Sequence, residues 1–139
     1  MLFFSKKRDE SGLSKECINF LNAVDYEYMR AFSTRSMRTL NTLLTRECAI
    51  NVSRLIFAVN SRYFGAEKFR TTSWTVMQEE ETFTRVLKDV VFDKVKVAGS
   101  LYIDIADNYR EVWELDTSEK ELKIRSIQSY AEYKRVMSC

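Results

Sequence analysis

The chain has 139 residues, a formal net charge of +2, and neither histidine nor proline. Its composition, 45% hydrophobic and 30% charged, is typical of one folded domain and excludes a disordered chain. Without histidine, one chain cannot assemble a Ser-His-Asp or Cys-His catalytic site, and it lacks the most common metal ligand.

The chain begins with four apolar residues (1–4) beside a basic cluster (6–8). Such a segment can act as a weak anchor at a membrane interface or be a frayed start, and we favour the second. No apolar run is long enough to span a membrane, so we expect no transmembrane segment. We interpret residues 1–13 as a flexible segment, 14–130 as a single domain and 131–139 as a tail that can add a short helix.

Two long amphipathic helices are predicted in the first half of the chain. Ser14 can cap the first, in which apolar residues recur at helical spacing over residues 17–32. A short helix is expected within residues 37–44. Thr45 can then cap a second long helix, whose apolar face runs over residues 48–63.

After Gly65, which can end this helix, the apolar residues alternate, and alternation predicts strands. The expected strands cover residues 69–78, 83–97, 101–106, 109–115 and 122–128. The second is long, so we expect a bend or bulge near Asp89. Helices followed by an antiparallel sheet predict an α+β fold, in which amphipathic helices pack on a curved, cone-shaped (cystatin-like) sheet of about four strands.

The predicted hairpin across residues 107–108 has two possible registers. A two-residue turn pairs Tyr102 with Trp113, whereas a three-residue turn pairs Ile103 with Trp113. We favour the three-residue turn because it gathers more apolar side chains on one face. In that register Glu111 is a carboxylate on an apolar surface.

Glu111 is the weak candidate for a catalytic residue, because a carboxylate in an apolar cone can serve as a base. Tyr102, Tyr109 and Trp113 would line the same pocket. The structural alternative, which we favour, is a glutamate at the rim of the cone that pairs with a nearby arginine.

Basic residues are concentrated in residues 30–70, which contain eight basic and two acidic groups and so carry +6. This asymmetry is typical of a surface for an anionic partner, or of a solvated helix face that pairs within the fold. The candidate residues for an anionic partner are Arg30, Arg35, Arg38, Arg46 and Arg54. Arg30, Arg38, Arg46 and Arg54 recur every eight residues and so spiral around a helix, and the helix aromatics lie at core positions and not as stacking platforms between the arginines, which argues against nucleic acid as a partner.

The three cysteines lack the spacing of a zinc site, and their odd number argues against a disulfide framework. We expect Cys17 and Cys48 to be small core residues and the compartment to be reducing, such as the cytoplasm. The three glycines are too far apart for a phosphate-binding loop, and we expect no metal or cofactor.

Residues 14–130 resemble the nuclear-transport-factor-2-like superfamily in their helical half, the aromatic-glycine end at 63–65 and the strands that follow. Within it they look most similar to the C-terminal domain of the membrane-tethering subunit of the mitochondrial protein-import motor and its bacterial relatives. Tyr109, Glu111 and Trp113 match the aromatic-x-Glu-x-Trp element of that family.

Leu122 and Ile124 depart from the family pattern, since they stand where a later tryptophan is expected. The resemblance implies an α+β cone but no single function, because this fold hosts isomerases, dehydratases, transport factors and membrane-apposed scaffolds. It also implies that a homodimer through the sheet is possible, and that partners are proteins or anionic lipid surfaces.

The leading hypothesis is a non-catalytic binding or scaffold domain for a protein or an anionic membrane surface, to which the chain would be peripheral. The alternatives are a small pocket enzyme or small-molecule binder that uses Glu111, and a nucleic-acid-associated protein.

Overall fold

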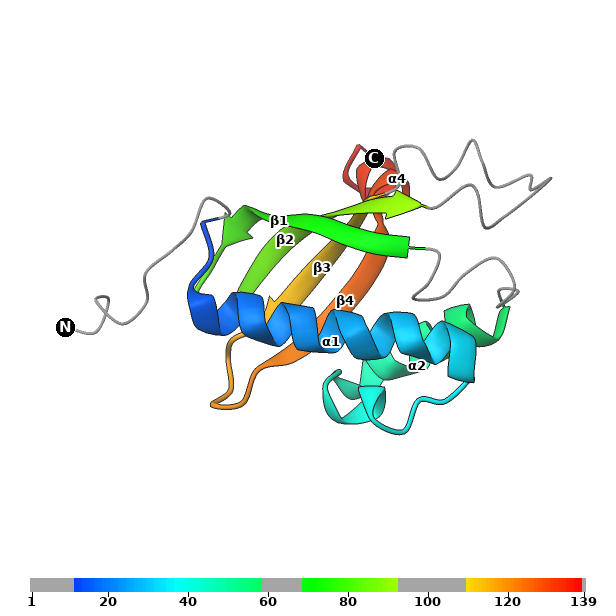
Figure 1. Cartoon of the computed structure of the whole chain (residues 1–139). Helices are drawn as coiled ribbons and strands as arrows, with labels where there is room; N and C mark the ends of the chain where they lie inside the picture. Colours follow the sequence, from blue (N-terminus) through cyan, green and yellow to red (C-terminus); the bar gives the residue numbers. More distant parts are fainter. Residues whose placement is uncertain (1–11, 59–68, 93–109, 139) are drawn as a thin grey trace.

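The computed structural model of the chain describes residues 12–58, 69–92 and 110–138. Its elements, in chain order, are α1 (Lys15–Thr34), η2 (Leu40–Thr42), α2 (Arg46–Ala58), β1 (Phe69–Glu79), β2 (Phe83–Phe92), β3 (Arg110–Asp116), β4 (Lys123–Ser129) and α4 (Tyr130–Met137). The helices α1 and α2 lie on one face of a curved antiparallel sheet (Figure 1). The predicted α+β fold, with helices before a four-stranded sheet, is confirmed.

The helix starts follow the predicted caps. Ser14 accepts a hydrogen bond from the backbone N–H of Cys17 at 3.2 Å, and Thr45 accepts one from the N–H of Cys48 at 3.4 Å. The short helix expected within residues 37–44 is reduced to the single 3-10 turn η2. The predicted end of the second helix at Gly65 lies outside the described residues.

The α1 helix ends at Arg35, which has the left-handed backbone conformation (φ 60°) that an L-residue adopts at a cost. Its backbone N–H donates to the carbonyl of Ala31 at 2.8 Å, and its guanidinium donates to the carbonyl of Ile56 at 3.1 Å. Arg35 therefore closes α1 and ties its end to the last turn of α2.

The four strands follow one another in the sheet in the order β1-β2-β3-β4. The irregularity expected near Asp89 lies on the partner strand: Thr71 pairs with Val90 and Ser73 with Asp89, so Thr72 is an extra residue in β1. A second extra residue lies further along β1, between positions 76 and 78. Extra residues bend and twist a strand, which accounts for the curvature of the sheet around the helices.

The predicted hairpin partner of Trp113 is wrong. Trp113 pairs with Val86 of β2 on one side and with Ile127 of β4 on the other, so neither Tyr102 nor Ile103 can pair with it. The expectation paired residues 101–106 with residues 109–115, whereas both edges of β3 are hydrogen-bonded to β2 and β4. Residues 101–106 themselves lie outside the described residues.

The linker between η2 and α2 lies along β4 and anchors the start of α2. The backbone N–H of Ile124 donates to the carbonyl of Leu43 at 3.0 Å, and the N–H of Thr45 donates to the carbonyl of Ile124 at 2.8 Å. This short parallel bridge between Leu44 and Ile124 buries both side chains. It thereby sets the position of α2 against the sheet.

Aromatic side chains fill the space between the helices and the sheet. The Trp113 indole is wholly buried and packs edge-on against the rings of Tyr28 at 5.4 Å and Trp74 at 5.1 Å. Phe32 packs edge-on against Tyr28 in turn, at 5.2 Å. Over the described residues, the inside of the cone is therefore a packed core.

The other face of the sheet carries α4, the helix that the tail was expected to add. Arg85 and Glu114 form an ion pair at 2.9 Å on this face, and the ring of Tyr133 lies 5.5 Å from the Arg85 guanidinium. The contacts of α4 with the sheet here are between an aromatic ring and a guanidinium group, and no residue of α4 is buried. Its attachment therefore adds little to the hydrophobic core.

Cys48 is a buried thiol of α2, and Cys17 lies partly buried against the same core. Burial raises the pKa of the Cys48 thiol from its ordinary value of 9.0 to about 12. The thiol therefore stays protonated at neutral pH, and a protonated thiol is a poor nucleophile.

We expect Cys48 to react with a thiol reagent only after unfolding, when Cys17 and Cys139 have been replaced by serine. Because the folded chain holds this proton and the unfolded chain releases it near pH 9, stability should fall between pH 9 and about 12. Urea titrations at each pH measure this contribution as the difference in the free energy of unfolding between the chain with Cys48 and Cys48→Ala. Rapid modification under native conditions would contradict the expectation.

Candidate functional site

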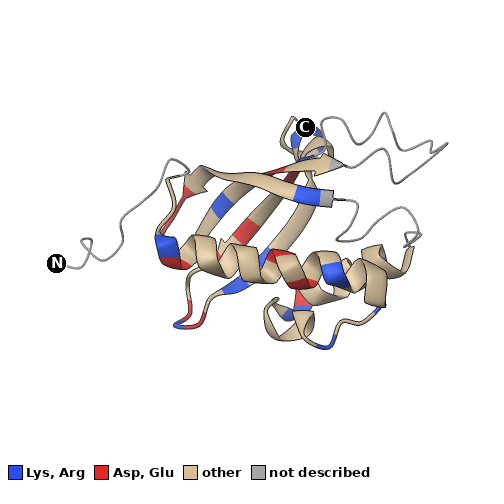
Figure 2. Cartoon of the chain, in the orientation of Figure 1, with Lys and Arg blue, Asp and Glu red and all other residues tan. Residues whose placement is uncertain are grey.

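Charged residues occur along the strands of the sheet that lies behind α1 in Figure 2. Lys88 of β2 is wholly buried and stands opposite Glu111 of β3 in the strand register. Its ammonium lies 2.8 Å from Glu111 Oε1 and 2.7 Å from Oδ1 of Asp25, which α1 contributes. These three residues, here called the interior cluster, place one cation between two carboxylates and join α1 to the middle of the sheet.

A second layer of donors surrounds the interior cluster. The Tyr28 hydroxyl donates to Glu111 Oε2 at 2.9 Å, and the Trp113 indole N–H donates to Glu111 Oε1 at 3.0 Å. The Thr71 hydroxyl donates to Asp25 Oδ2 at 2.5 Å. In the part of the chain that the structure describes, every buried side-chain nitrogen and oxygen has a hydrogen-bond partner.

The position of Glu111 corrects the interpretation that it is a rim glutamate paired with an arginine. It is 3% exposed, so it does not lie at the rim, and its ionic partner is Lys88 instead of an arginine. Both of its oxygens already accept hydrogen bonds from protein donors. A general base must reach the proton that it removes, and the contacts of Glu111 hold it against the core instead.

Of the predicted pocket residues, the structure brings Glu111 and Trp113 together, and Tyr102 and Tyr109 lie outside the described residues. Sequence reasoning missed Lys88 and Asp25. The available signal was a charged residue at an apolar-face position in each of two elements. Lysine and aspartate are seldom buried unless paired, so two such positions indicate an internal ion pair.

The predicted arginines frame two hollows on the helical side of the molecule. The first, the α2 hollow, has a volume of about 640 Å³ and lies between α2 and the segment around η2. It is lined by Met37, Asn41, Leu44, Arg46, Ala49, Ile50, Ser53 and Arg54. The second, the α1 hollow, is smaller, at about 280 Å³, and includes Arg30 and Arg38 at the end of α1. We call the surface with Arg30, Arg38, Arg46, Arg54 and both hollows the helical face.

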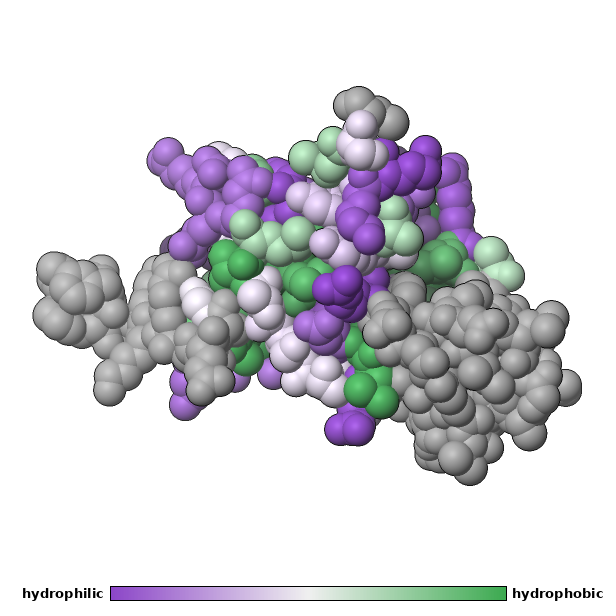
Figure 3. All heavy atoms as spheres, turned by 90° about the horizontal axis from the view of Figure 1, so that it is seen from above, coloured by the Kyte–Doolittle hydropathy of each residue, from purple (hydrophilic) through white to green (hydrophobic). Residues whose placement is uncertain are grey.

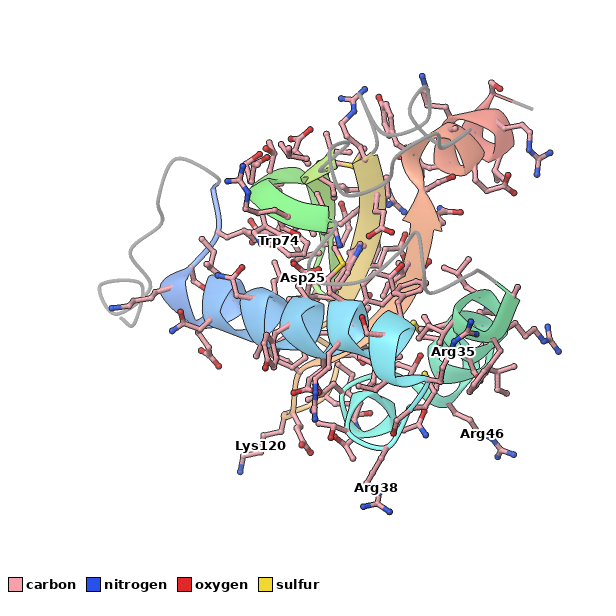
Figure 4. All side chains as sticks on the ribbon, turned by 45° about the vertical axis from the view of Figure 1, so that its right-hand side comes forward. Asp25, Arg35, Arg38, Arg46, Trp74 and Lys120 are labelled. Atoms are coloured by element: carbon pink, nitrogen blue, oxygen red, sulfur yellow. The ribbon has the colours of Figure 1, made fainter. Side chains whose placement is uncertain are left out.

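The five arginines differ in their partners. Arg30 pairs with Glu27 at 3.4 Å, and Arg35 is used to join α1 to α2. The other three, Arg38, Arg46 and Arg54, are exposed and form no ion pair with another described residue. Figure 4 shows Arg38 and Arg46 extending away from the helices, while Arg35 lies beside α2.

Exposed apolar side chains lie on several elements, among them Val136 and Met137 of α4. Seen from above (Figure 3), apolar residues form small areas separated by hydrophilic ones where grey atoms do not cover them. On α2, Ile50 and Phe57 are 46% and 55% exposed, and Ile50 borders the α2 hollow. The helical face therefore combines unpaired cations with exposed apolar area.

Other classes of site find no support among the residues described. Over residues 12–58, 69–92 and 110–138, no group of three or more Cys, Asp or Glu side chains could hold a metal ion. No helix in these ranges is long and apolar enough to cross a membrane. Comparison with models of known protein families and with curated proteins finds no match.

Proposed function

We propose that the chain is a non-catalytic binding domain whose helical face docks an anionic partner. The observation that carries this proposal is the α2 hollow, where two exposed guanidinium groups, Arg46 and Arg54, flank an apolar lining. Guanidinium groups bind carboxylate and phosphate oxygens through paired hydrogen bonds. An apolar hollow between two such groups is suited to a ligand that is both anionic and partly apolar.

The interior cluster supports binding over catalysis. The described polar groups of the interior are engaged with one another, and the Trp113 indole occupies the space beside Glu111. A pocket enzyme would need that space for its substrate. The helical face, in contrast, presents Arg38, Arg46 and Arg54, which form no ion pair with a described carboxylate.

The relationship to the nuclear-transport-factor-2-like superfamily and a cytoplasmic or other reducing location are part of this proposal. The order of helices followed by an antiparallel sheet supports the relationship. The free thiols of Cys17 and Cys48 support a reducing compartment.

The proposal is tested with two probes, anionic vesicles rich in phosphatidylserine and a displayed library of helical peptides that differ in charge. At low salt we expect the wild-type chain to bind at least one. The double variant Arg46→Glu/Arg54→Glu should bind about tenfold or more weakly, because each basic residue near an anionic surface contributes about 1 kcal/mol. Added salt should weaken wild-type binding, since these charges are exposed.

The matched control is Lys15→Glu/Lys120→Glu, which changes the net charge equally at exposed positions outside the two hollows. We expect a much smaller loss from this control. If the two double variants lose binding equally, the loss follows from net charge alone, and a site on the helical face is refuted. Failure of the wild-type chain to bind either probe would refute the function.

A further inference from the structure

We propose that the partner of the α2 hollow is an acidic amphipathic helix of another protein, which inserts one apolar side chain between Arg46 and Arg54. This inference rests on the proposed function and specifies its partner. A lipid surface is the competing partner, and the shape and the charge spacing of the hollow favour a helix.

The shape of the α2 hollow suits a docked helix. The α2 hollow is walled by two separate segments: Met37 and Leu44 come from the residues around η2, and Ala49 and Ser53 come from α2. The small side chains of Ala49 and Ser53 are four residues apart, so they lie on the same side of α2. They leave room above the helix backbone, where a side chain of a docked helix can enter as in other helix-in-groove complexes.

The spacing of the two arginines also suits a helix. Arg46 and Arg54 are eight residues apart on one helix, so their Cα atoms are separated by about 12 Å along its axis. A partner helix that lies along α2 presents carboxylates at this spacing when they are two turns apart. The apolar anchor then falls one turn from each carboxylate, over the hollow. The expected motif is therefore an acidic residue, an apolar residue three or four positions later, and a second acidic residue after the same interval.

The border of the α2 hollow is apolar as well as cationic. Ile50 lies one turn from both Arg46 and Arg54, and Phe57 lies a further turn along the same side of α2. Both are exposed, so cationic and apolar side chains alternate along one stripe of the helix. This alternation complements the acidic and apolar faces of an amphipathic helix. Lipid headgroups would need only the arginines and would leave the hollow unused.

The test selects binders from the displayed library on the wild-type chain and sequences them. We expect enrichment of the acidic-apolar-acidic spacing, and loss of binding by tenfold or more when Ser53→Trp fills the hollow. Ile50→Glu, at an exposed position where folding is not at risk, should also weaken binding by repelling the acidic residues. Asn51→Trp, exposed on α2 but outside the hollow lining, is the control and should bind like the wild-type chain.

The outcomes separate this inference from the proposed function. If only the vesicles bind, and charge reversal at Arg46 and Arg54 abolishes that binding, the proposed function stands and the helix partner is refuted. Enriched peptides without an apolar anchor, or unchanged binding in both Ser53→Trp and Ile50→Glu, also refute the helix partner. If neither probe binds, both proposals fail. Thermal unfolding of each variant verifies that it is folded.

Discussion

Replacement of Lys88 by methionine is expected to lower the free energy of unfolding by about 3–5 kcal/mol, the cost typical of breaking a buried ion pair from one side. Methionine has a similar length and also suits a buried site, so the main change is the loss of the ammonium. Asp25 and Glu111 would then remain buried without the cation that lies within 2.8 Å of both. The cost arises from these uncompensated carboxylates.

Urea unfolding followed by tryptophan fluorescence measures this effect, because Trp74 and Trp113 are both buried. The control Lys120→Met removes an exposed lysine and should change stability by less than about 0.5 kcal/mol. The double variant Lys88→Met/Glu111→Gln should recover part of the loss, since one carboxylate charge is removed with the cation. Equal stability of Lys88→Met and the wild-type chain would contradict a structural role for the interior cluster.

The features that the sequence predicted well depend on contacts between near neighbours. The cap at Ser14 is satisfied three residues away, at Cys17, and the cap at Thr45 is satisfied at Cys48. Helical and alternating periods likewise arise within one element, so the element order and the fold class followed from them.

The features that it missed depend on distant segments. Asp25 and Lys88 are separated by 63 residues, and nothing local to either side chain identifies the other as its partner. The partner of Trp113 was mispredicted for the same reason, because it is Val86 of β2, and nothing local to Trp113 identifies β2 as the strand that pairs with β3.

Only part of the candidate surface could be predicted from the sequence. The concentration of arginines indicated an anionic partner, but the α2 hollow lies between α2 and the segment around η2, whose residue Leu43 is hydrogen-bonded to the distant Ile124 of β4. Spacing alone also could not separate Arg35, which joins two helices, from Arg46, which extends into solvent (Figure 4).

Replacement of Trp113 by alanine should cost about 3–5 kcal/mol of stability, as large-to-small changes in packed cores do. The indole is wholly buried between Tyr28 and Trp74, so alanine leaves a cavity that these rings cannot easily close. It also removes the N–H that donates to Glu111. Trp113→Phe keeps most of the ring contacts and should cost less, about 1–3 kcal/mol, chiefly for the lost hydrogen bond to a buried carboxylate.

Urea unfolding again provides the measurement, followed by far-UV circular dichroism because a reporter tryptophan is removed. Tyr26→Ala is the control, since Tyr26 is an aromatic residue of α1 that is 65% exposed, and it should cost less than about 0.5 kcal/mol. If Trp113→Ala cost no more than Tyr26→Ala, the inside of the cone would be loosely packed and able to admit a ligand beside Glu111. The pocket-binding alternative would then become the stronger hypothesis. A loss of several kcal/mol would instead leave the helical face as the surface on which to look for a partner.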